Sequence, residues 1–577
     1  MRTFLTSMFF LVAVAMLAMP SKALAASDTL TVFADGPALD EIINADTTAG
    51  GLQAHSVYKL VSLDTTYLYL GKITFNSDVT ILGVPGSDGR KPCIQPGILS
   101  SGSMPSELFI LNANNMNAVF KNLYFYGLSI AGNGNWGKAI LVSADYVRVT
   151  MDSCVVDENR GETIAYTGTM DKFFITNCNF RDGVYATDQF STTIVVAAWP
   201  TSNPADSIVM KNNTIFCING YAAAPGQSKS LTYFEFTHNT IVYNFVEPFI
   251  IYCVQNAKIN DNIFYGLFAG AETVAEYPWW HQSFSAEIGA IVSIDTLTAA
   301  ADSVVGPELL GQDNARMLIE AKRNIEVKNN CFYQPTALTD FWTAWNDTAT
   351  GSDSLYTPSW MDNRTKSMFA NDADWPGFVE SGNVFVDPGF GNDLKAVLTD
   401  KGQMEGVISL LEYVERIRKG TSAGYIWGYK NQDVVSAANF IPNWPLPEAD
   451  DMKYSNETLK TAATDGLPVG DYRWFGTTVS VDDNVNTLPS KFALSEAYPN
   501  PFNPSTNVKF SIAKAGNISL KVYNITGELV KVVADNVYRE AGEYQYTLNM
   551  SNFSSGVYFY TLTQGAQQIT KKLVLMK

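Results

Sequence analysis

An eight-residue phrase recurs through the middle of this 577-residue chain. Two apolar residues stand two positions apart, an asparagine follows three positions after the second, and another apolar residue closes the phrase. It occurs at residues 208–215, 234–241, 257–264 and 325–332, and variants without the asparagine occur at 118–125, 149–156 and 173–180. A repeat of this kind restricts the chain to folds built from stacked copies of one unit.

The spacing of the repeat indicates the size of that unit. The second apolar positions are Phe120, Met151, Ile175, Met210, Phe236, Ile259 and Val327. Their separations are 31, 24, 35, 26, 23 and 68 residues, and the shortest cluster near 24. Residues two apart on a strand point to the same face. The sequence therefore predicts a parallel β-helix with one coil per repeat, the longer gaps being loops that leave the coils.

The residue after each repeated strand is polar or small. Asn213, Asn239, Asn262 and Asn330 occupy this place. Because asparagine tolerates a left-handed backbone and bonds its own turn, we expect these four to take that conformation and to stack as an asparagine ladder. Cys154 and Cys178 hold the same place in their coils. They either stack as small buried thiols or form a disulfide, for which parallel side chains are poorly aimed.

The repeat over about residues 55–390 resembles the right-handed parallel β-helix of the pectate-lyase superfamily. This resemblance implies an all-β right-handed parallel β-helix with loop insertions, which we place at residues 26–392. A polar cap is needed where an open stack exposes its strand edges. We expect residues 39–45 to be a short capping helix, and residues 77–83 and 116–126 to begin the first coils.

The pattern changes after Gly391. Met404, Val407, Leu411 and Val414 repeat at helical spacing, and Gly420 ends the run. We expect a helix-containing, loop-rich extension at residues 393–475 and a polar linker at 476–490.

The N-terminus is typical of a secretory signal peptide, at residues 1–25. Arg2 provides positive charge, residues 4–19 are an apolar run, and Ala23-Leu24-Ala25 is a small-x-small cleavage site. No later run is long and apolar enough to cross a bilayer. We therefore expect an exported chain with no membrane-spanning segment after cleavage.

The C-terminal 85 or so residues read as a small β-sandwich. Strand-like runs at 507–512, 518–523, 544–548, 557–563 and 568–575 are separated by turn residues. Several ordered motifs in residues 491–577 resemble the type A sorting domain of the type IX secretion system. They are Tyr498-Pro499-Asn500-Pro501-Phe502-Asn503-Pro504-Ser505, the segment 521–528 with Gly527, the segment 556–560 that starts at Gly556, and the basic, apolar end with Lys571 and Lys572. The resemblance implies an outer-membrane translocon as partner and a secreted or cell-surface location.

Charge and composition limit the partners. The net charge of −18 disfavours nucleic acid, which needs a basic surface. An acidic polysaccharide remains open if a local basic patch or a bridging cation such as Ca²⁺ is present. The six cysteines include no Cys-x-x-Cys pair, which disfavours zinc, and three histidines disfavour a multi-histidine metal centre.

The outward positions of the repeated strands are where chemistry is expected. Polysaccharide lyases with this fold use a Lys or Arg base beside a site that neutralises a uronate, in most cases with Ca²⁺. Lys211, Glu235 and Lys258 fall on three successive coils and are the candidate catalytic residues. The chain matches neither the acidic calcium motif nor the basic catalytic pair of known lyases. The alternative is a solvated face with weak cross-coil ion pairs. Hydrolysis by paired carboxylates, with Asp152 and Asp157 on one coil, is less favoured.

Two aromatic-rich insertions, at about 265–324 and 333–377, are candidates for sugar binding. Trp279, Trp280, Trp342 and Trp345 are the named substrate-binding candidates, since indole faces stack on sugar rings. The alternative is that these rings bury the loops against the coils. We therefore expect a polysaccharide-recognising protein, either a lyase or a glycosidase, or else a non-catalytic adhesin or a structural surface protein.

Overall fold

The computed structural model describes residues 28–62, 65–129, 137–183, 192–198, 203–225, 231–270, 273, 289–297, 323–400, 408–421, 452–476, 492–512, 516–539, 542–565 and 567–577. The signal peptide, Trp279 and Trp280 lie outside these residues, as do Met404, Val407 and nearly all of the expected linker. The chain forms two compact units, divided between Gly476 and Thr477. No described helix is long and apolar enough to cross a membrane.

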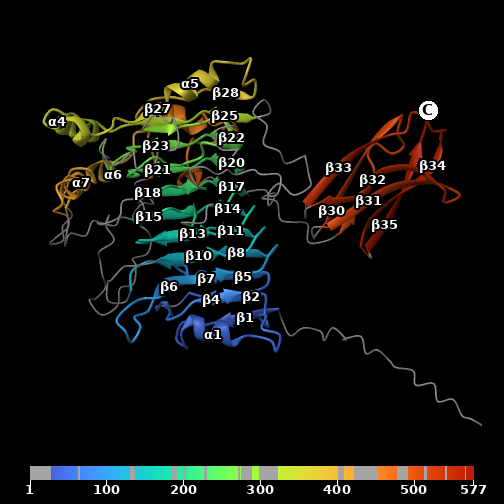
Figure 1. Ribbon diagram of the computed structural model, residues 1–577, viewed down its shortest axis with the longest axis horizontal. Coiled ribbons are helices and arrows are strands. Elements are labelled where there is room, and N and C mark those ends of the chain that lie inside the picture. The colour runs from blue at the N-terminus through green and yellow to red at the C-terminus, as the bar shows by residue number, and fades with distance from the viewer. Residues whose placement is uncertain are drawn as a thin grey trace, which may run out of the picture. The chain divides into compact units, whose positions relative to one another are not determined.

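The first unit is a parallel β-helix whose coils stack in sequence order from β1 and α1 at one end to β28 and α5 at the other (Figure 1). Each full coil contributes one strand to each of three parallel sheets. Sheet 1 has eleven strands, namely β1 (Thr29–Val32), β2 (Val57–Val61), β5 (Val79–Val84), β8 (Asn117–Lys121), β11 (Arg148–Asp152), β14 (Lys172–Thr176), β17 (Ala205–Lys211), β20 (Leu231–Thr237), β22 (Val254–Asn260), β25 (Asn324–Lys328) and β28 (Phe378–Ser381).

The other two sheets follow the same order along the stack. Sheet 2 has nine strands, namely β3 (Tyr67–Tyr69), β6 (Cys93–Pro96), β9 (Tyr124–Tyr126), β12 (Val155–Asp157), β15 (Asn179–Gly183), β18 (Thr214–Ile218), β21 (Thr240–Val242), β23 (Ile263–Tyr265) and β26 (Cys331–Tyr333). Sheet 3 has six, namely β4 (Ile73–Phe75), β7 (Glu107–Leu111), β10 (Lys138–Val142), β13 (Glu162–Tyr166), β16 (Val195–Ala197) and β19 (Ala223–Ala224). A separate parallel pair joins β24 (Ala290–Val292) to β27 (Ser359–Met361).

The seven apolar positions that define the repeat form one column inside the β-helix. Register pairs join Phe120 to Met151, and the column continues in the same way to Val327 on β25. All seven side chains are fully buried. The predicted fold class, a parallel β-helix followed by a small β-sandwich, is confirmed.

The predicted asparagine ladder is present and is longer than expected. Oδ1 of Asn239 accepts hydrogen bonds from the backbone N and Nδ2 of Asn213, at 3.0 and 2.9 Å. The same two bonds recur from Asn239 to Asn262, from Asn262 to Asn330, and from Asn330 to Asn383, a fifth member. Each Nδ2 from Asn213 to Asn330 also donates to a carbonyl of the preceding coil. The ladder therefore satisfies a continuous line of buried amides.

The expectation of a left-handed backbone at the ladder asparagines is wrong by one position. The preceding residues Asn212, His238, Asp261 and Asn329 take it, with φ between 52° and 60°. The turn from sheet 1 to sheet 2 has two residues, and the left-handed first residue turns the second one inward. Gly382 holds this place in the last coil, with φ of 68°.

The six cysteines are all within the described residues, and none forms a disulfide. Cys154 and Cys178 stack in adjacent coils, where Sγ of Cys178 accepts a hydrogen bond from the Cys154 backbone N at 3.4 Å. Both thiols are buried. They continue the line of the asparagine ladder towards the N-terminal coils, because Oδ1 of Asn213 accepts from the Cys178 backbone N.

Helices close the stack and cover parts of its side. The expected capping helix is α1 (Leu39–Ala45), which buries Leu39 and Ile43. The expected helix near residue 411 is α7 (Leu410–Arg418), capped by Ser409. The segment 333–377, taken as an insertion loop, contains α4 (Thr336–Asn346), the short helix η3 (Gly351–Asp353), β27 and α5 (Asn363–Phe369), and α6 (Asn392–Ala396) follows.

Residues 452–476, which we call the strap, run back along the turns between sheets 1 and 2. The strap contains the short helices η4 (Glu457–Thr461) and η5 (Tyr472–Phe475). Ser455 bonds Gly389 beside the last coil, Thr464 bonds Asp261, and Arg473 bonds Asn179. The strap thus crosses the coils in reverse order and ends at the boundary of the first unit.

The second unit is a sandwich of two antiparallel sheets with its own core. One sheet contains β29 (Ala493–Leu494), β30 (Ser505–Ile512) and β33 (Gly542–Asn549). The other contains β32 (Leu529–Arg539), β31 (Gly516–Asn524), β34 (Gly556–Gln564) and β35 (Gln567–Leu575). Strands β30, β31, β33, β34 and β35 correspond to the runs predicted from the sequence, whereas β29 and β32 were not predicted.

Candidate functional site on the outer face of sheet 1

The structure brings the three catalytic candidates to one patch on the outer face of sheet 1. Glu235 and Lys258 face each other in register on β20 and β22, and Lys258 also faces Glu326 on β25. Lys211 on β17 lies in register with Thr237, and reaches diagonally to place Nζ 2.7 Å from Oε1 of Glu235. The patch is thus a row of alternating charges along the stack.

The carboxylates of this patch are held by neighbouring groups. Tyr233 donates its hydroxyl to Oε2 of Glu235 at 2.6 Å, and Lys328 Nζ lies 2.6 Å from Oε2 of Glu326. Burial opposes ionisation of Glu326, but hydrogen bonds from Lys328 and Asn260 lower its pKa. Burial, together with the hydrogen bond to Glu235, raises the pKa of Tyr233. The carboxylates of Glu235 and Glu326 therefore both have partners within the patch already.

Lys258 differs from the other cations of the patch. Its side chain is exposed on β22, and within the described part of the chain it forms no ion pair. Lys211 and Lys328 are each committed to a carboxylate. The ammonium of Lys258 is consequently the cation of this patch that a ligand can engage without displacing an existing partner.

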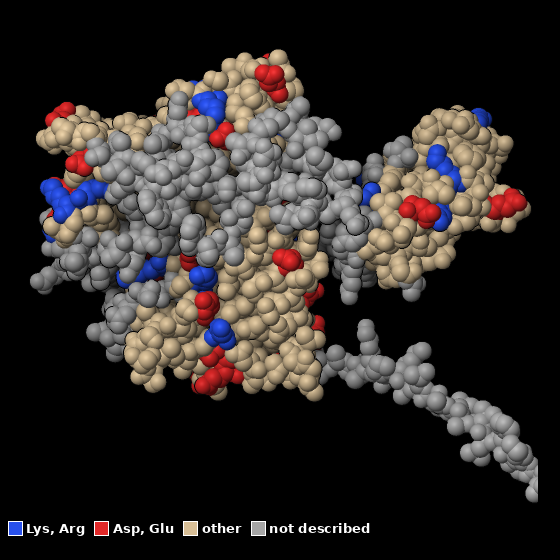
Figure 2. Space-filling model, in the orientation of Figure 1, with Lys and Arg blue, Asp and Glu red and all other residues tan. Residues whose placement is uncertain are grey.

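Uncharged hydrogen-bonding groups border the charged row. Tyr233, Asn256 and Asn324 are in register on three successive strands, and Asn324 Nδ2 donates to Asn256 Oδ1 at 3.2 Å. Elsewhere on this face, Lys121 pairs with Asp152 at 3.0 Å and Lys172 with Asp206 at 3.3 Å. On the side of the molecule drawn in Figure 2, the described surface of the N-terminal coils carries few charged groups, and its acidic and basic groups lie close together. These ion pairs between neighbouring coils agree with the alternative given in the sequence analysis, a solvated sheet face with weak cross-coil ion pairs.

The two described tryptophan candidates differ in exposure. Trp342 on α4 is 2% exposed and belongs to the core, so its ring has no free face for a sugar. Trp345 is partly exposed, and its Nε1 donates to the Asp353 carbonyl at 3.1 Å. The burial of Trp342 agrees with the alternative interpretation, in which these rings bury the loops against the coils.

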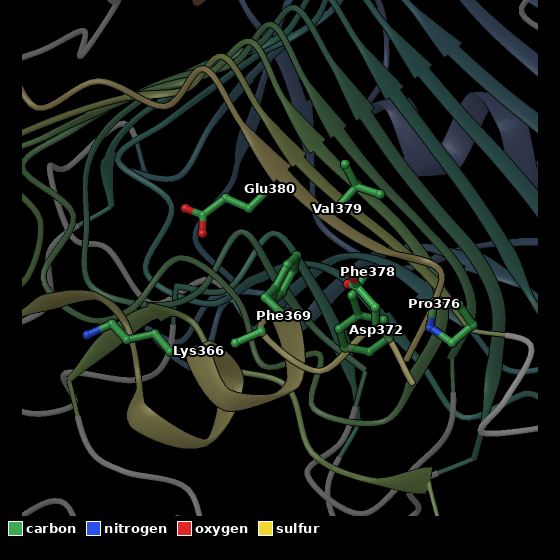
Figure 3. Close-up of a pocket in the computed structure, with 8 residues that line it drawn as sticks. Lys366, Phe369, Asp372, Pro376, Phe378, Val379 and Glu380 are labelled. Atoms are coloured by element: carbon green, nitrogen blue, oxygen red, sulfur yellow. The ribbon is translucent and has the colours of Figure 1, made fainter. Parts of the chain in front are cut away.

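A shallow pocket of about 640 Å³ lies at the C-terminal end of the stack, between α5 and β28 (Figure 3). Phe369, Phe378 and Pro376 provide apolar walls, and Lys366, Asp372 and Glu380 provide charge. Glu380 is already engaged, because Trp360 Nε1 donates to its Oε1 at 2.9 Å.

A buried ionic cluster on sheet 2 was not found from the sequence, although Asp157 was named. Arg181 Nη1 lies 3.5 Å from Asp157 Oδ2 on the adjacent coil, and Tyr124 donates its hydroxyl to the same carboxylate. Burial, with the neighbouring charge of Asp157, raises the pKa of Glu158 to about 8. Glu158 is 3% exposed, so a polymer cannot reach this group in the structure as it stands.

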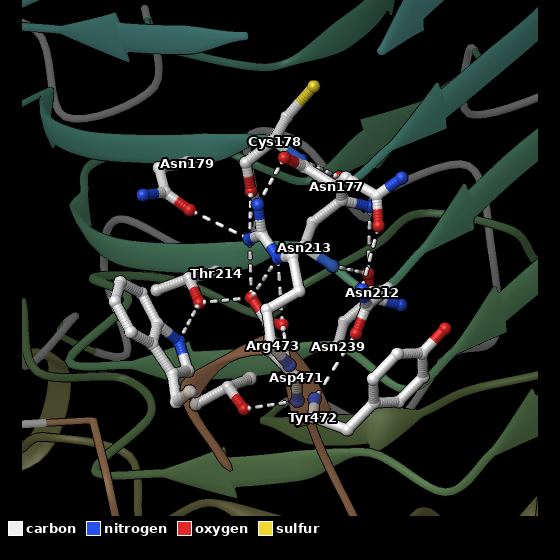
Figure 4. A network of polar contacts seen from close by, with 12 residues as sticks. Asn177, Cys178, Asn179, Asn212, Asn213, Thr214, Asn239, Asp471, Tyr472 and Arg473 are labelled. Atoms are coloured by element: carbon white, nitrogen blue, oxygen red, sulfur yellow. Dashed lines mark hydrogen bonds and ion pairs between the residues drawn. The ribbon is translucent and has the colours of Figure 1, made fainter. Parts of the chain in front are cut away.

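His238 lies in the turn after β20 and contacts the strap. Nδ1 faces the Pro468 carbonyl at 3.2 Å and Nε2 faces Oδ2 of Asp465 at 3.1 Å. Figure 4 shows the neighbouring contacts of Asp471, Tyr472 and Arg473 with the turns of sheets 1 and 2. These side chains join the strap to the coils, and none of them faces the row on sheet 1.

A calcium site is not supported by the donor groups at hand. The described residues include no group of three or more His, Cys, Asp or Glu side chains placed to hold a metal ion. The carboxylates of Glu235 and Glu326 are occupied by Lys211, Lys328, Tyr233 and Asn260. These carboxylates therefore offer no free set of ligands for a metal ion at this patch.

The residues of the sorting motifs hold the two ends of the second unit together. Asn500 donates through Nδ2 to the Lys572 carbonyl at 3.0 Å and accepts from the Val574 backbone N at 2.8 Å. Phe502 is buried and pairs with the end of β35. Lys571 pairs with Glu496 at 2.8 Å. Gly527, with φ of 82°, occupies the turn between β31 and β32, and Gly556 begins β34.

Comparison with known proteins identifies this second unit. Residues 496–576 match the secretion system C-terminal sorting domain. No curated protein and no solved structure matches the chain. The chain therefore ends in a type IX sorting domain, and the protein is exported to the outer cell surface or released outside the cell. The resemblance of the β-helix to the pectate-lyase superfamily stays a prediction.

Proposed function

Because the chain ends in a secretion sorting domain, we propose that the protein works outside the cell and binds an acidic polysaccharide along the outer face of sheet 1. Lys258 supplies the contact to a carboxylate of the polymer. Tyr233, Asn256 and Asn324 supply hydrogen bonds to its hydroxyl groups. The row runs along the stack across β20, β22 and β25, as an extended polymer chain requires.

The observation that carries this proposal is the exposed ammonium of Lys258 between two carboxylates that other groups already hold. A protein of net charge −18 repels an acidic polymer unless a local cation offsets the repulsion. Charged hydrogen bonds to a carboxylate contribute more than neutral ones. Neutral polysaccharides lack the carboxylate and gain nothing from this contact, so the proposal includes a preference for acidic polymers.

Binding is tested with the purified full-length chain and a panel of acidic and neutral polysaccharides. We expect Lys258→Ala to weaken binding of an acidic polymer about tenfold or more, because a charge-assisted hydrogen bond contributes about 1.5–3 kcal/mol. The matched control is Lys121→Ala, which removes a sheet 1 lysine that is paired with Asp152. Equal binding by both variants, or no binding of any polymer by the parent protein, overturns the proposal.

The same incubation separates binding from cleavage. Ultraviolet absorbance of unsaturated sugars rising together with reducing ends identifies a lyase, and reducing ends alone identify a glycosidase. If cleavage occurs, Lys211→Ala and Lys258→Ala test the two basic candidates, and unchanged rates in both remove them from the chemistry. Binding without any product identifies a non-catalytic adhesin. Calcium is included in one arm and withheld in the other.

A further inference from the structure

The second unit exposes apolar side chains in a way that its own fold does not require. Its exposed large apolar residues are Tyr498, Ile525, Leu529, Val532, Val557, Phe559 and Met576. The described part of the much longer β-helix unit has eight, of which Val379, Phe385 and Val386 lie at its last coil. Clustered exposed apolar groups mark interaction sites.

Four of these side chains share one face of one sheet. In the sheet β32-β31-β34-β35 of Figure 1, the core side is formed by Leu520, Val522, Tyr560 and their neighbours. Leu529, Tyr523 and Phe559 are in register on three adjacent strands and point to the opposite side. Val532 and Val557 point the same way, from β32 and β34. Leu529 is 49% exposed and Phe559 is 36% exposed.

The charge around this face is slight. Lys572 faces Phe559 in register on β35 and, among the described residues, forms no ion pair. Lys521 lies in the next row but is held by Asp535 at 2.8 Å. Binding to an anionic membrane surface needs a cluster of about four to eight basic residues. A face with one available lysine fits a protein partner better than a lipid surface.

The whole unit nevertheless differs in charge from the rest of the chain. Residues 492–577 contain eight Lys and Arg and five Asp and Glu, a net charge of +3, whereas the chain as a whole carries −18. A partner of this unit therefore contacts a mildly basic, partly apolar surface. The complementary surface on the partner is an apolar patch with a carboxylate placed to contact Lys572.

We propose that the outer face of the sheet β32-β31-β34-β35, centred on Leu529, Tyr523 and Phe559, is the docking surface for a protein component of the secretion apparatus. The partner presents an apolar patch with an acidic group opposite Lys572. The match of residues 496–576 to a sorting domain carries the choice of partner, because this segment exists to be recognised during export. The inference is independent of polysaccharide binding by sheet 1.

Export of the full-length chain by its own cells tests the surface. We expect the double variant Leu529→Ser with Phe559→Ser to reach the cell surface or medium on the order of tenfold less than the parent, since buried aromatic contacts dominate protein interfaces. The matched control is Val379→Ser, which alters an exposed apolar side chain on β28 of the β-helix. Phe559→Tyr keeps an aromatic ring and should preserve export. Lys572→Glu should lower export, and its surface position leaves the core intact.

Normal export of the double variant overturns the proposal. Two further measurements on that variant then assign the face. Loss of a self-association that the parent protein shows by sedimentation assigns it to a second copy of the chain, and loss of binding to phosphatidylglycerol vesicles assigns it to a membrane. Circular dichroism of the purified variants checks folding, and export loss in Lys572→Glu supports the proposal where the double variant is unfolded.

Discussion

Glu380 accepts a hydrogen bond through Oε1 from Nδ2 of Asn383, the last asparagine of the ladder, at 3.2 Å. In the preceding coils the corresponding amide donates to the asparagine of the next coil. Glu380 replaces that missing acceptor, and Trp360 donates to the same oxygen. The ladder is therefore capped by a carboxylate within its own coil.

Removing the cap should loosen the last coil and leave the others unchanged. In Glu380→Ala the Nδ2 of Asn383 and the Nε1 of Trp360 lose an acceptor, although water replaces part of the loss because Glu380 is exposed. We expect a local cost of about 1 kcal/mol. Hydrogen exchange should quicken in residues 378–386 alone. Asp372→Ala, in the same pocket, is the control, and unchanged exchange in the first variant would contradict the cap.

An interior rung of the ladder should matter more than its end. Asn239 accepts two hydrogen bonds from Asn213 and donates to Asn262 and to the Met210 carbonyl. Asn239→Ala leaves these buried groups unpaired, at a cost of about 2–5 kcal/mol for two to three lost partners. Chemical denaturation measures the change in the free energy of unfolding. Asn117→Ala, on the outer face of β8, should cost less than about 0.5 kcal/mol.

The coils could be predicted from the sequence because each one repeats the same local chemistry. Phe120, Ile175 and Phe236 are apolar for the same reason, namely that each packs on the equivalent residue of the next coil. The last coil lies inside the predicted range of 26–392, but its repeat phrase was not recognised, because Glu380 stands where the repeat has its second apolar residue, in register with Val327. That position has no further described coil above it, so an apolar side chain is not required there.

The strap and the candidate site were less accessible to prediction. The strap bonds residues more than 200 positions away, such as Asp261 with Thr464, through single polar contacts that leave no periodic pattern. At the site, Lys211 and Lys258 look equivalent in the sequence. Only the register and the side-chain reach show that Lys211 is committed to Glu235, whereas Lys258 stays exposed.

Asp171 should make the β-helix less stable as the pH rises. Burial raises the pKa of Asp171 from 3.8 to about 8, and only Oδ1 has a hydrogen-bond donor, the Val147 backbone N at 2.8 Å. Between pH 4 and 8 the folded state holds a proton that the unfolded state releases. The free energy of unfolding therefore falls by about 1.4 kcal/mol per pH unit in this window, and this contribution is level above and below it.

Asp171→Asn should remove this slope, because the amide keeps an acceptor for Val147 and cannot ionise. We expect the variant to unfold at a higher denaturant concentration than the parent at pH 7.5, with little difference at pH 4. Denaturation midpoints from pH 4 to 9 measure the effect. In the preceding coil Asp145 accepts from the Thr169 backbone N, and its charge adds to the raised pKa of Asp171, so Asp145→Asn should reduce the slope in part without abolishing it. Parallel pH curves for the parent and Asp171→Asn would be inconsistent with a raised pKa.

The strap should depend on the ion pair between the buried Asp471 and the partly exposed Arg473. Asp471 is 2% exposed, accepts from Thr214 at 2.7 Å and pairs with Arg473, which also donates to Asn179 at 2.8 Å. In Arg473→Ala the carboxylate stays buried without its cation, and breaking such a pair costs about 3–5 kcal/mol. Undocking of the strap end is cheaper than leaving that charge buried, so we expect residues 470–476 to detach while the coils stay folded.

Detachment has a local optical and proteolytic signature. Trp474 donates through Nε1 to Thr214 at 2.8 Å, so its indole should move towards water and its fluorescence should shift to longer wavelength. Limited proteolysis should cut near residue 473 in Arg473→Ala before it cuts the coils. Adding Asp471→Asn removes the stranded charge and should restore part of the docking. If Arg473→Ala instead unfolds the coils and the strap in one transition, the strap is an inseparable part of the β-helix. In either case the pair of Asp471 and Arg473 contributes more to stability than the pair of Lys460 and Glu457. Loss of that second, more exposed pair should change the free energy of unfolding little.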